Sequence, residues 1–281
     1  MVIKLKKVKF KITFFSILLL IITLVVLGLN TNLKTTFYEV QSDKVNSPVK
    51  IAFISDFHSC YYGEDQKILL NAIDAQNPDV VLYGGDIFDD RQPYDNAIAL
   101  LKAMQNKYPA YYVTGNHEYR NGEADILKDI VRSYNIKVLE NEQDTINING
   151  EIINIFGAND PDSNIYISPV QYFQQQLEVV KYINDNGNFT ILLTHRPELF
   201  STYKDYPVDL ALAGHAHGGQ WRIPWILNGV YSPNQGFFPK YPGGKYEHDD
   251  TTMIVSTGLS NRMFLVPRIY NPPEIVIINI K

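Results

Sequence analysis

Short apolar segments recur along most of the chain, each bounded by glycine, aspartate or asparagine. Their β-branched and aromatic residues are typical of strands that are mostly buried. We predict strands at residues 49–55, 80–83, 110–114, 152–156, 190–193, 210–213, 253–256 and 274–280. Helical spacing of apolar residues is found between the early strands, at residues 65–76, 96–106 and 124–134. This alternation indicates an α/β fold, and the later strands, which have no predicted helices between them, indicate a second, partly antiparallel sheet.

The N-terminal part of the chain has a different pattern. Five lysines lie within residues 1–11, and residues 12–29 form an uncharged apolar run. In a helix this run spans roughly 27 Å, close to the thickness of the hydrocarbon core of a bilayer. The first alanine of the chain is Ala52, so the run lacks the small-residue cleavage site of a signal peptide. This favours an uncleaved transmembrane signal anchor over a cleaved signal peptide.

An anchor of this kind also predicts where the rest of the chain is located. The positive-inside rule keeps the basic segment, residues 1–11, in the cytoplasm and places the body on the extracytoplasmic side of the cell membrane. We interpret residues 30–47 as a polar linker and residues 48–281 as the folded domain.

Composition and charge add further limits. The chain has 281 residues, of which 45% are hydrophobic and 20% charged, as in an ordinary folded protein. Six lysines within residues 1–36 leave 19 basic and 30 acidic side chains in the remainder, a formal charge of −11. An acidic body argues against a nucleic-acid partner, because binding to a phosphate backbone needs cations. The single cysteine, Cys60, excludes an intramolecular disulfide and a cysteine-rich zinc site, and its role stays open.

Polar residues collect where the predicted strands end. Five turns read SDFH (55–58), GGDIFD (84–89), GNHE (115–118), THRP (194–197) and GHAHGGQ (214–220). Sites in open α/β sheets form beyond the carboxyl ends of the strands, so these turns can converge on one place. Five of the six histidines lie in them, and only His248 does not. Structural histidines scattered through a fold would not be concentrated in this way.

The residue types in these turns suit transition metals. Imidazole, carboxylate and amide ligands together favour Mn, Fe or Zn over Ca or Mg. The set is too large for one tetrahedral zinc, and two metals about 3.5–4 Å apart need a shared ligand, for which Asp86 is best placed. Two divalent ions, two aspartates and a bridging hydroxide leave a charge of about +1, which favours an anionic phosphate.

In this order, the motifs D-x-H, G-D-x-x-D, G-N-H-E, H and G-H-x-H resemble the signature of the calcineurin-like metallophosphoesterases, from residue 49 to about 281. The segments GHAHGGQ, NQGFFPKY and YNPPEIVIINI resemble one branch, the membrane-associated bacterial phosphodiesterases of the YkuE/YaeI type. Relatives in that branch cleave lipid-linked pyrophosphates such as UDP-diacylglucosamine. The resemblance implies a four-layer α/β/β/α sandwich of two mixed sheets, preceded by one transmembrane helix.

The resemblance also implies a role for each motif residue. One metal would take Asp56, His58, Asp86 and His217, and the other would take Asp86, Asn116, His195 and His215. Asp89 and His117 match the catalytic dyad of the family. His117 would protonate the leaving oxygen or hold the phosphoryl group, and Asp89 would orient His117. Ala216 replaces the commoner threonine of the last motif, which removes no ligand.

Four further residues are candidate substrate contacts. Arg196 follows a ligand and Arg262 lies in a later turn, where either could clamp a phosphate or a carboxylate. The alternative for each is a surface salt bridge. Trp225 and Phe237 belong to an aromatic loop, residues 221–241, that could receive acyl chains or touch a membrane. The alternative is a loop that packs on itself at the rim of the site.

The sequence therefore predicts a hydrolase that cleaves phosphoesters with two divalent metal ions. We expect a phosphodiesterase or pyrophosphatase that uses a metal-bridging hydroxide on a lipid-linked or envelope substrate. A broad-specificity phosphomonoesterase or protein phosphatase is the main alternative. A non-enzymatic scaffold is disfavoured by the complete ligand set, and we predict no protein partner.

Overall fold

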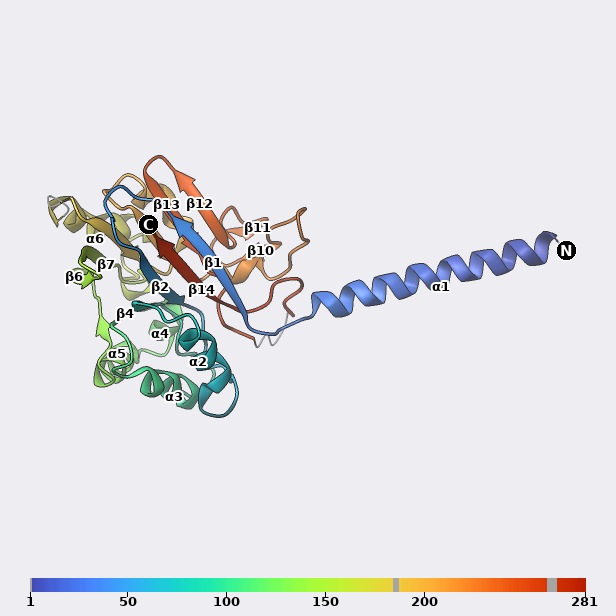
Figure 1. Ribbon diagram of the computed structural model, residues 1–281, viewed down its shortest axis with the longest axis horizontal. Coiled ribbons are helices and arrows are strands. Elements are labelled where there is room, and N and C mark those ends of the chain that lie inside the picture. The colour runs from blue at the N-terminus through green and yellow to red at the C-terminus, as the bar shows by residue number, and fades with distance from the viewer. Residues whose placement is uncertain (1, 184–186, 262–266) are drawn as a thin grey trace.

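A computed structural model describes residues 2–183, 187–261 and 267–281 (Figure 1). A long N-terminal helix, α1 (Val2–Gly28), precedes a body built on two six-stranded mixed sheets and one small hairpin. The α/β class and the two mixed sheets expected from the sequence are thus confirmed.

The first sheet contains the early strands and the last one. Its order is β1 (Lys34–Val40), β14 (Glu274–Ile280), β2 (Val49–Ile54), β3 (Val80–Gly84), β4 (Ala110–Val113) and β5 (Lys137–Val138). Strands β2 to β5 are parallel, whereas β14 runs antiparallel to β2 and parallel to β1. The carboxyl ends of β2, β3 and β4 therefore meet at one edge of this sheet.

The second sheet has antiparallel strands at both edges. Its order is β12 (Gly244–His248), β13 (Thr251–Val255), β9 (Leu210–Ala213), β8 (Phe189–Leu193), β7 (Glu151–Gly157) and β6 (Glu142–Ile148). The four inner strands are parallel to their neighbours, and β12 and β6 run against them. A separate antiparallel hairpin pairs β10 (Tyr231–Ser232) with β11 (Gly236–Phe237).

Helices cover the outer face of each sheet. The α-helices of the body are α2 (Lys67–Asp74), α3 (Asp95–Met104), α4 (Asn116–Arg120), α5 (Ala124–Ser133), α6 (Pro169–Ile183) and α7 (Phe200–Tyr203). Short 3₁₀ turns are η1 (Glu64–Gln66), η2 (Pro161–Ser163), η3 (Pro197–Leu199) and η4 (His217–Gly219). Figure 1 places α2, α3 and α5 beside the first sheet, with α6 on the opposite side of the body.

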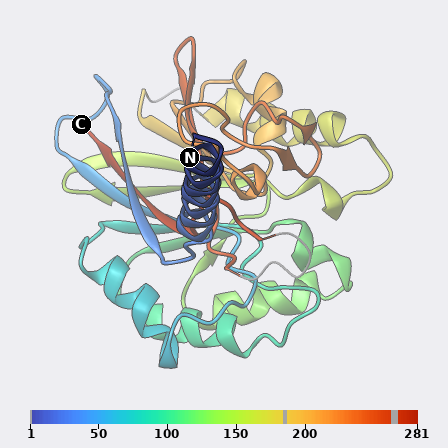
Figure 2. The ribbon, with the colours of Figure 1, turned by 90° about the vertical axis from the view of Figure 1, so that its right-hand side faces the viewer.

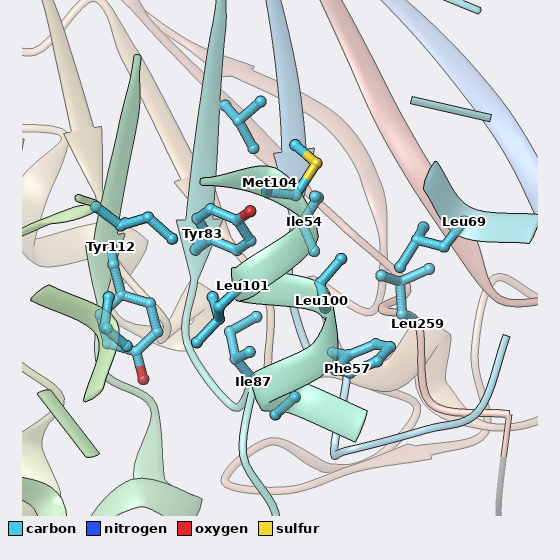
Figure 3. Close-up of a cluster of buried hydrophobic side chains, with 14 of the residues drawn as sticks. Ile54, Phe57, Leu69, Tyr83, Ile87, Leu100, Leu101, Met104, Tyr112 and Leu259 are labelled. Atoms are coloured by element: carbon cyan, nitrogen blue, oxygen red, sulfur yellow. The ribbon is translucent and has the colours of Figure 1, made fainter. Parts of the chain in front are cut away.

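Three apolar cores define four layers. Alternate residues of a strand point to opposite faces, so β2 directs Ile51 and Phe53 into the core between the sheets and Ala52 and Ile54 outward. The outward side chains of the first sheet pack against α2, α3 and α5, where Ile54 lies close to Leu100 of α3 (Figure 3). A third core joins β7, β8 and β9 to α6 and α7. The order helix, sheet, sheet, helix matches the four-layer sandwich that was expected.

Two expectations about the chain between these elements were wrong. Residues 30–47, expected to be a polar linker, contain β1, which pairs with β14 along its whole length. The later strands were expected to follow one another without helices, but the 15-residue helix α6 lies between β7 and β8.

The N-terminal helix extends away from the body (Figures 1 and 2). Among the described residues, α1 is the one helix whose length and apolar composition suffice to cross a membrane, over residues 11–28. Its apolar side chains from Ile12 to Leu27 are largely exposed. At its end, Tyr270 donates a hydrogen bond from Oη to the carbonyl of Leu24 (2.5 Å) and another from its backbone N–H to the carbonyl of Gly28 (2.7 Å).

Candidate metal centre

The candidate ligands lie directly after five strands. Asp56 and His58 follow β2, Asp86 follows β3, Asn116 follows β4, His195 follows β8, and His215 and His217 follow β9. Five of these seven residues, Asp56, His58, Asp86, His215 and His217, have positive φ between 47° and 66°. Side chains other than glycine rarely adopt this backbone, and such strain is concentrated at functional sites. The strained backbone of these turns therefore lowers local stability and sets the direction of these side chains.

Two glycines let the turns pack closely around the carboxylates. A Cβ atom on Gly115 would collide with the carboxylate of Asp86, and one on Gly214 would collide with that of Asp56. In the space that results, the backbone N–H of His117 donates to Asp86 Oδ1 (2.8 Å), and that of His215 donates to Asp56 Oδ1 (2.9 Å). Each aspartate is thus fixed by a turn that belongs to another strand.

The ligand atoms form two adjacent groups. One contains Asp56, His58 and His217, and the other contains Asp86, His195 and His215, with the ligand atoms of each group within 4.8 Å of one another. Asp86 Oδ2 lies 3.1 Å from His195 Nε2 and 3.7 Å from His58 Nε2, so it reaches both groups. A third group of this kind, His58, Asp89 and His117, shares His58 with the first. The assignment of seven ligands to two metals stays a prediction from the motifs.

Unpaired buried atoms show that the pocket fits metal ions. His58 Nε2 and Asn116 Oδ1 are buried without a hydrogen-bond partner in the described structure, whereas Asp86 Oδ2 and His195 Nε2, also buried, form an ion pair with each other (3.1 Å). Leaving a buried polar atom unpaired costs about 1–3 kcal/mol, so the two unpaired atoms, which come from two different turns, need an explanation. All four are atoms that bind metals, and the histidine nitrogens suit transition metals.

In three of the histidines, a hydrogen bond to one ring nitrogen leaves the other nitrogen available to bind a metal. His195 Nδ1 lies 2.7 Å from the carbonyl oxygen of Gly84, and His58 Nδ1 lies 3.0 Å from Asp89 Oδ2, which leaves both Nε2 atoms facing the centre. His215 is held the other way, with Nε2 2.8 Å from Asn234 Oδ1. Such partners fix the tautomer and the ring orientation of metal-binding histidines.

Neighbouring side chains in the pocket shift one another's pKa values. Burial alone would raise the pKa of Asp86, but His195 and His117 outweigh it and hold the pKa well below its usual range. Burial would lower the pKa of His195, but Asp86 and Asp56 outweigh it and raise the pKa to about 10. Burial lowers the pKa of His215 and His217 well below the ordinary value, so both are neutral and ready to bind a cation.

The expected dyad is arranged differently from the prediction. Asp89 Oδ2 is 3.0 Å from His58 Nδ1 but 3.9 Å from His117 Nδ1, so Asp89 orients a ligand. The neighbouring carboxylate of Asp90 contacts His117 Nδ1 instead, and Arg120 Nη1 lies 2.8 Å from His117 Nε2. The ring of His117 itself lies 4.4 Å from that of His58, at the edge of the centre.

The four candidate substrate contacts differ in their surroundings. Arg196 is buried and bonded through Nε and Nη2 to Asp160 (2.5 and 2.8 Å), so it braces the turn beside His215 and is not free to clamp a second phosphate. Arg262 lies outside the described residues. Trp225 is fully exposed, and Phe237 is largely exposed on the hairpin β10–β11.

Three residues that position the site were not predicted from the sequence. Glu118 accepts hydrogen bonds from the backbone around Asp86, and Asn234 holds His215. Asn271 donates to the carbonyls of His217 (2.7 Å) and Gln220 (3.2 Å) and so fixes the last ligand turn. All three lie in segments that carry the family resemblance, but their spacing gave no sign of these contacts.

Comparisons with known proteins agree with this geometry. A model of the calcineurin-like phosphoesterase family matches residues 49–219. The chain is 31% identical to an uncharacterized metallophosphoesterase of Campylobacter jejuni, over 95% of this chain and 69% of that protein. It is 29% identical to the metallophosphoesterase YkuE of Bacillus subtilis, over 83% of this chain and 79% of that protein.

A solved structure is similar in fold. The protein TT1561 of Thermus thermophilus gives a TM-score of 0.52 at 12% identity, covering 76% of this chain and 92% of that one. The family match spans more than half of the chain and includes all seven candidate ligands. The chain therefore belongs to the calcineurin-like phosphoesterases, metal-dependent hydrolases that act on phosphoester bonds.

Proposed function

We propose that this phosphoesterase works with two divalent transition metals, Mn, Fe or Zn, and hydrolyses a phosphodiester or pyrophosphate bond. The position of Asp86 Oδ2 carries the proposal, because it lies within 4.0 Å of His58, His117 and His195. A carboxylate that reaches ligands of both groups can be shared by two cations about 3.5–4 Å apart.

The chain's own residues supply orientation and a proton donor. Bound metals of this kind lower the pKa of a water molecule and withdraw charge from phosphoryl oxygens. Backbone N–H groups hold Asp56 and Asp86 in place before the substrate arrives. Burial lowers the pKa of His117, and the carboxylates of Asp86 and Asp90 oppose that shift. In the protonated form, Nδ1 would donate to Asp90 and Nε2 would give its proton to the leaving oxygen in place of the contact with Arg120.

We assign a lipid-linked or envelope substrate on two features. The apolar helix α1 suits a membrane anchor, and the lysines before it favour a body on the extracytoplasmic side. The hairpin β10–β11 exposes Phe237 and Phe238, while Asn234 in its turn contacts His215. An acyl chain lying on this hairpin would place its headgroup beside the metal centre.

Metal analysis of the full chain, purified in detergent, tests the metal centre. We expect two transition metals per chain, and we expect His217→Ala to lose metal and activity together. The control is His248→Ala, because His248 is half-exposed and pairs with Asp249 (2.7 Å) away from the ligand turns. Full activity of thoroughly metal-free protein would refute the proposal.

Paired substrates test the specificity. Faster hydrolysis of an aryl diester than of an aryl monoester would support a diesterase, and the reverse would establish a phosphomonoesterase. Phe237→Ser should reduce the rate on a lipid-linked pyrophosphate and spare the soluble diester. Equal losses on both would contradict the lipid assignment.

His117→Asn separates catalysis from metal binding. The variant should keep its metals and lose about 10²–10⁴-fold in rate on substrates with poor leaving groups. Unchanged turnover on those substrates would reject the role given to His117.

A further inference from the structure

A surface beside the exit of α1 carries large apolar side chains in solvent. Trp221, Ile223, Trp225 and Ile226 form this surface, which we call the apolar collar. Trp225 is fully exposed and Ile226 is 82% exposed, while Trp221 and Ile223 are each nearly half-exposed. Contiguous exposed apolar side chains on a folded protein commonly mark a surface that binds a partner or a membrane.

Hydrogen bonds fasten the collar to the end of α1. The indole N–H of Trp221 donates to the carbonyl of Pro267 (2.8 Å), and the backbone N–H of Arg222 donates to that of Ile269 (2.9 Å). The next residue, Tyr270, holds α1 through Leu24 and Gly28 and also lines a pocket with the collar loop. Figure 1 shows β10 and β11, which follow this loop, on the side of the body from which α1 leaves.

The connection between α1 and the body is short. The helix ends at Gly28 and β1 begins at Lys34, so five residues join them. Fully extended, five residues span at most about 16–18 Å. If α1 crosses a bilayer, the body therefore lies against the lipid surface, with the collar on the near side.

The charge of this region suits a membrane surface. Residues 210–246 contain no aspartate or glutamate, although acids outnumber bases in the body as a whole. The three charged residues in the stretch are basic: Arg222, Lys240 and Lys245. A stretch without acids, lying in an acidic protein, avoids repulsion from anionic headgroups.

We propose that the apolar collar inserts into the headgroup region of the bilayer that α1 crosses. Interfacial segments with aromatic and aliphatic tips bury about 5–10 Å into the boundary between headgroups and acyl chains. The body is then held by α1 and by the collar, which fixes its orientation over the lipid. This inference rests on the anchoring by α1 proposed above, and it does not depend on catalysis.

Tryptophan fluorescence tests the collar directly, because the chain has only two tryptophans. In the full-length Trp221→Phe variant, Trp225 is the only tryptophan, and it is excited at the red edge where tyrosine does not absorb. The protein is placed in vesicles of phosphatidylcholine and phosphatidylglycerol whose acyl chains carry bromine, a contact quencher. We expect bromines near the headgroup end of the chains to quench Trp225 more than bromines near the terminal methyl groups. Iodide in the water should quench it weakly.

A matched control places a tryptophan on the other side of the body. Ile126 is 61% exposed on α5, which lies away from α1 in Figure 1. Ile126→Trp, in a chain with both native tryptophans changed to phenylalanine, should be quenched by iodide and not by bromolipid.

Three results would overturn the inference, and each is distinguishable. Strong iodide quenching of Trp225 in chains that float with the vesicles would show that the collar is exposed to water and not inserted in the bilayer. Protection of Trp225 from both quenchers would show that a second copy or the body covers it. Failure of the chain to float with the vesicles would also refute membrane anchoring by α1. Absence of phosphoester hydrolysis, with Trp225 still quenched by bromolipid, would refute only the proposed function.

Discussion

Glu118 offers a sharp test of how the strand-end turns are held together. Its carboxylate is fully buried and accepts four backbone hydrogen bonds of 2.8–3.1 Å. Oε1 accepts from Ile87 and Phe88, and Oε2 accepts from Asp86 and Gly115. One side chain thus ties the turn after β3 to the turn after β4, and both turns carry candidate ligands.

The substitution Glu118→Gln replaces one oxygen by an NH₂ group. Whichever way the amide is turned, two of the four N–H donors lose their acceptor and face another donor. Each unpaired buried group costs about 1–3 kcal/mol, so we expect a loss of about 2–6 kcal/mol in the free energy of unfolding. That is a large share of the roughly 5–15 kcal/mol that stabilises a typical domain.

The assay is urea denaturation of the full chain in detergent, with metal affinity as a second measurement. Burial and the nearby Asp86 raise the pKa of Glu118 to about 7, so the comparison is made above that pH, where Glu118 is ionised. We expect metal affinity to fall about 10–100-fold, as when other supporting groups of a metal site are removed.

Glu123→Gln is the matched control, since Glu123 accepts one hydrogen bond, from Tyr94 (2.7 Å), and its amide can still accept it. This change should stay within about 0.5 kcal/mol of the native protein. If Glu118→Gln also costs less than about 0.5 kcal/mol, or leaves metal affinity unchanged, the carboxylate does not hold the two turns as described.

Three other predictions follow from contacts of the centre. Asp160→Asn removes the closest counter-charge of the buried Arg196, which keeps Asp162 (2.9 Å) and Glu198 (3.6 Å). The change should cost about 1–3 kcal/mol in unfolding experiments, and a cost below about 0.5 kcal/mol would refute the bracing role. His195, with a pKa raised from 6.5 to about 10, stabilises the metal-free fold fully below pH 6.5, and this contribution is lost as the pH rises through 10. Metal uptake at neutral pH should therefore release a proton, measurable by calorimetry in buffers of different ionisation enthalpy. Asp90→Asn should slow hydrolysis of esters with poor leaving groups while the metals stay bound, and an unchanged rate would show that Asp90 does not support His117.

The buried parts of both sheets could be predicted from the sequence. Central strands such as β2 and β8 are covered on both faces, so each appears as an apolar run. The edge strands β1, β6 and β12 were missed, because each is largely polar where it faces solvent and no apolar run marks it. Helix α6 was missed although Phe173, Leu177 and Val180, all buried, have helical spacing.

The candidate ligands were predictable for a different reason. Each lies in a turn after a strand, and the carboxyl ends of parallel strands meet at one edge, so the pattern predicted that the turns converge. The assignment of the seven residues to two metals came from the family resemblance. The pairing of Asp89 with His58 was not predictable, because it depends on side-chain directions set by positive φ at His58. Asn234 comes from a hairpin far from the strand ends, and no spacing rule connects it to His215.

The place of β14 in the first sheet has a consequence for biosynthesis. Although β14 comes after all the other described strands along the chain, it lies between β1 and β2 and pairs with both. At about 5–20 residues per second, roughly 10–50 s pass between the emergence of β1 and that of β14 from the ribosome. During this interval the nascent chain exposes the unpaired edge of β2, so chaperone binding should be strongest just before β14 emerges. A stop codon ahead of Glu274 would make that exposure permanent and direct the product to aggregation or proteolysis.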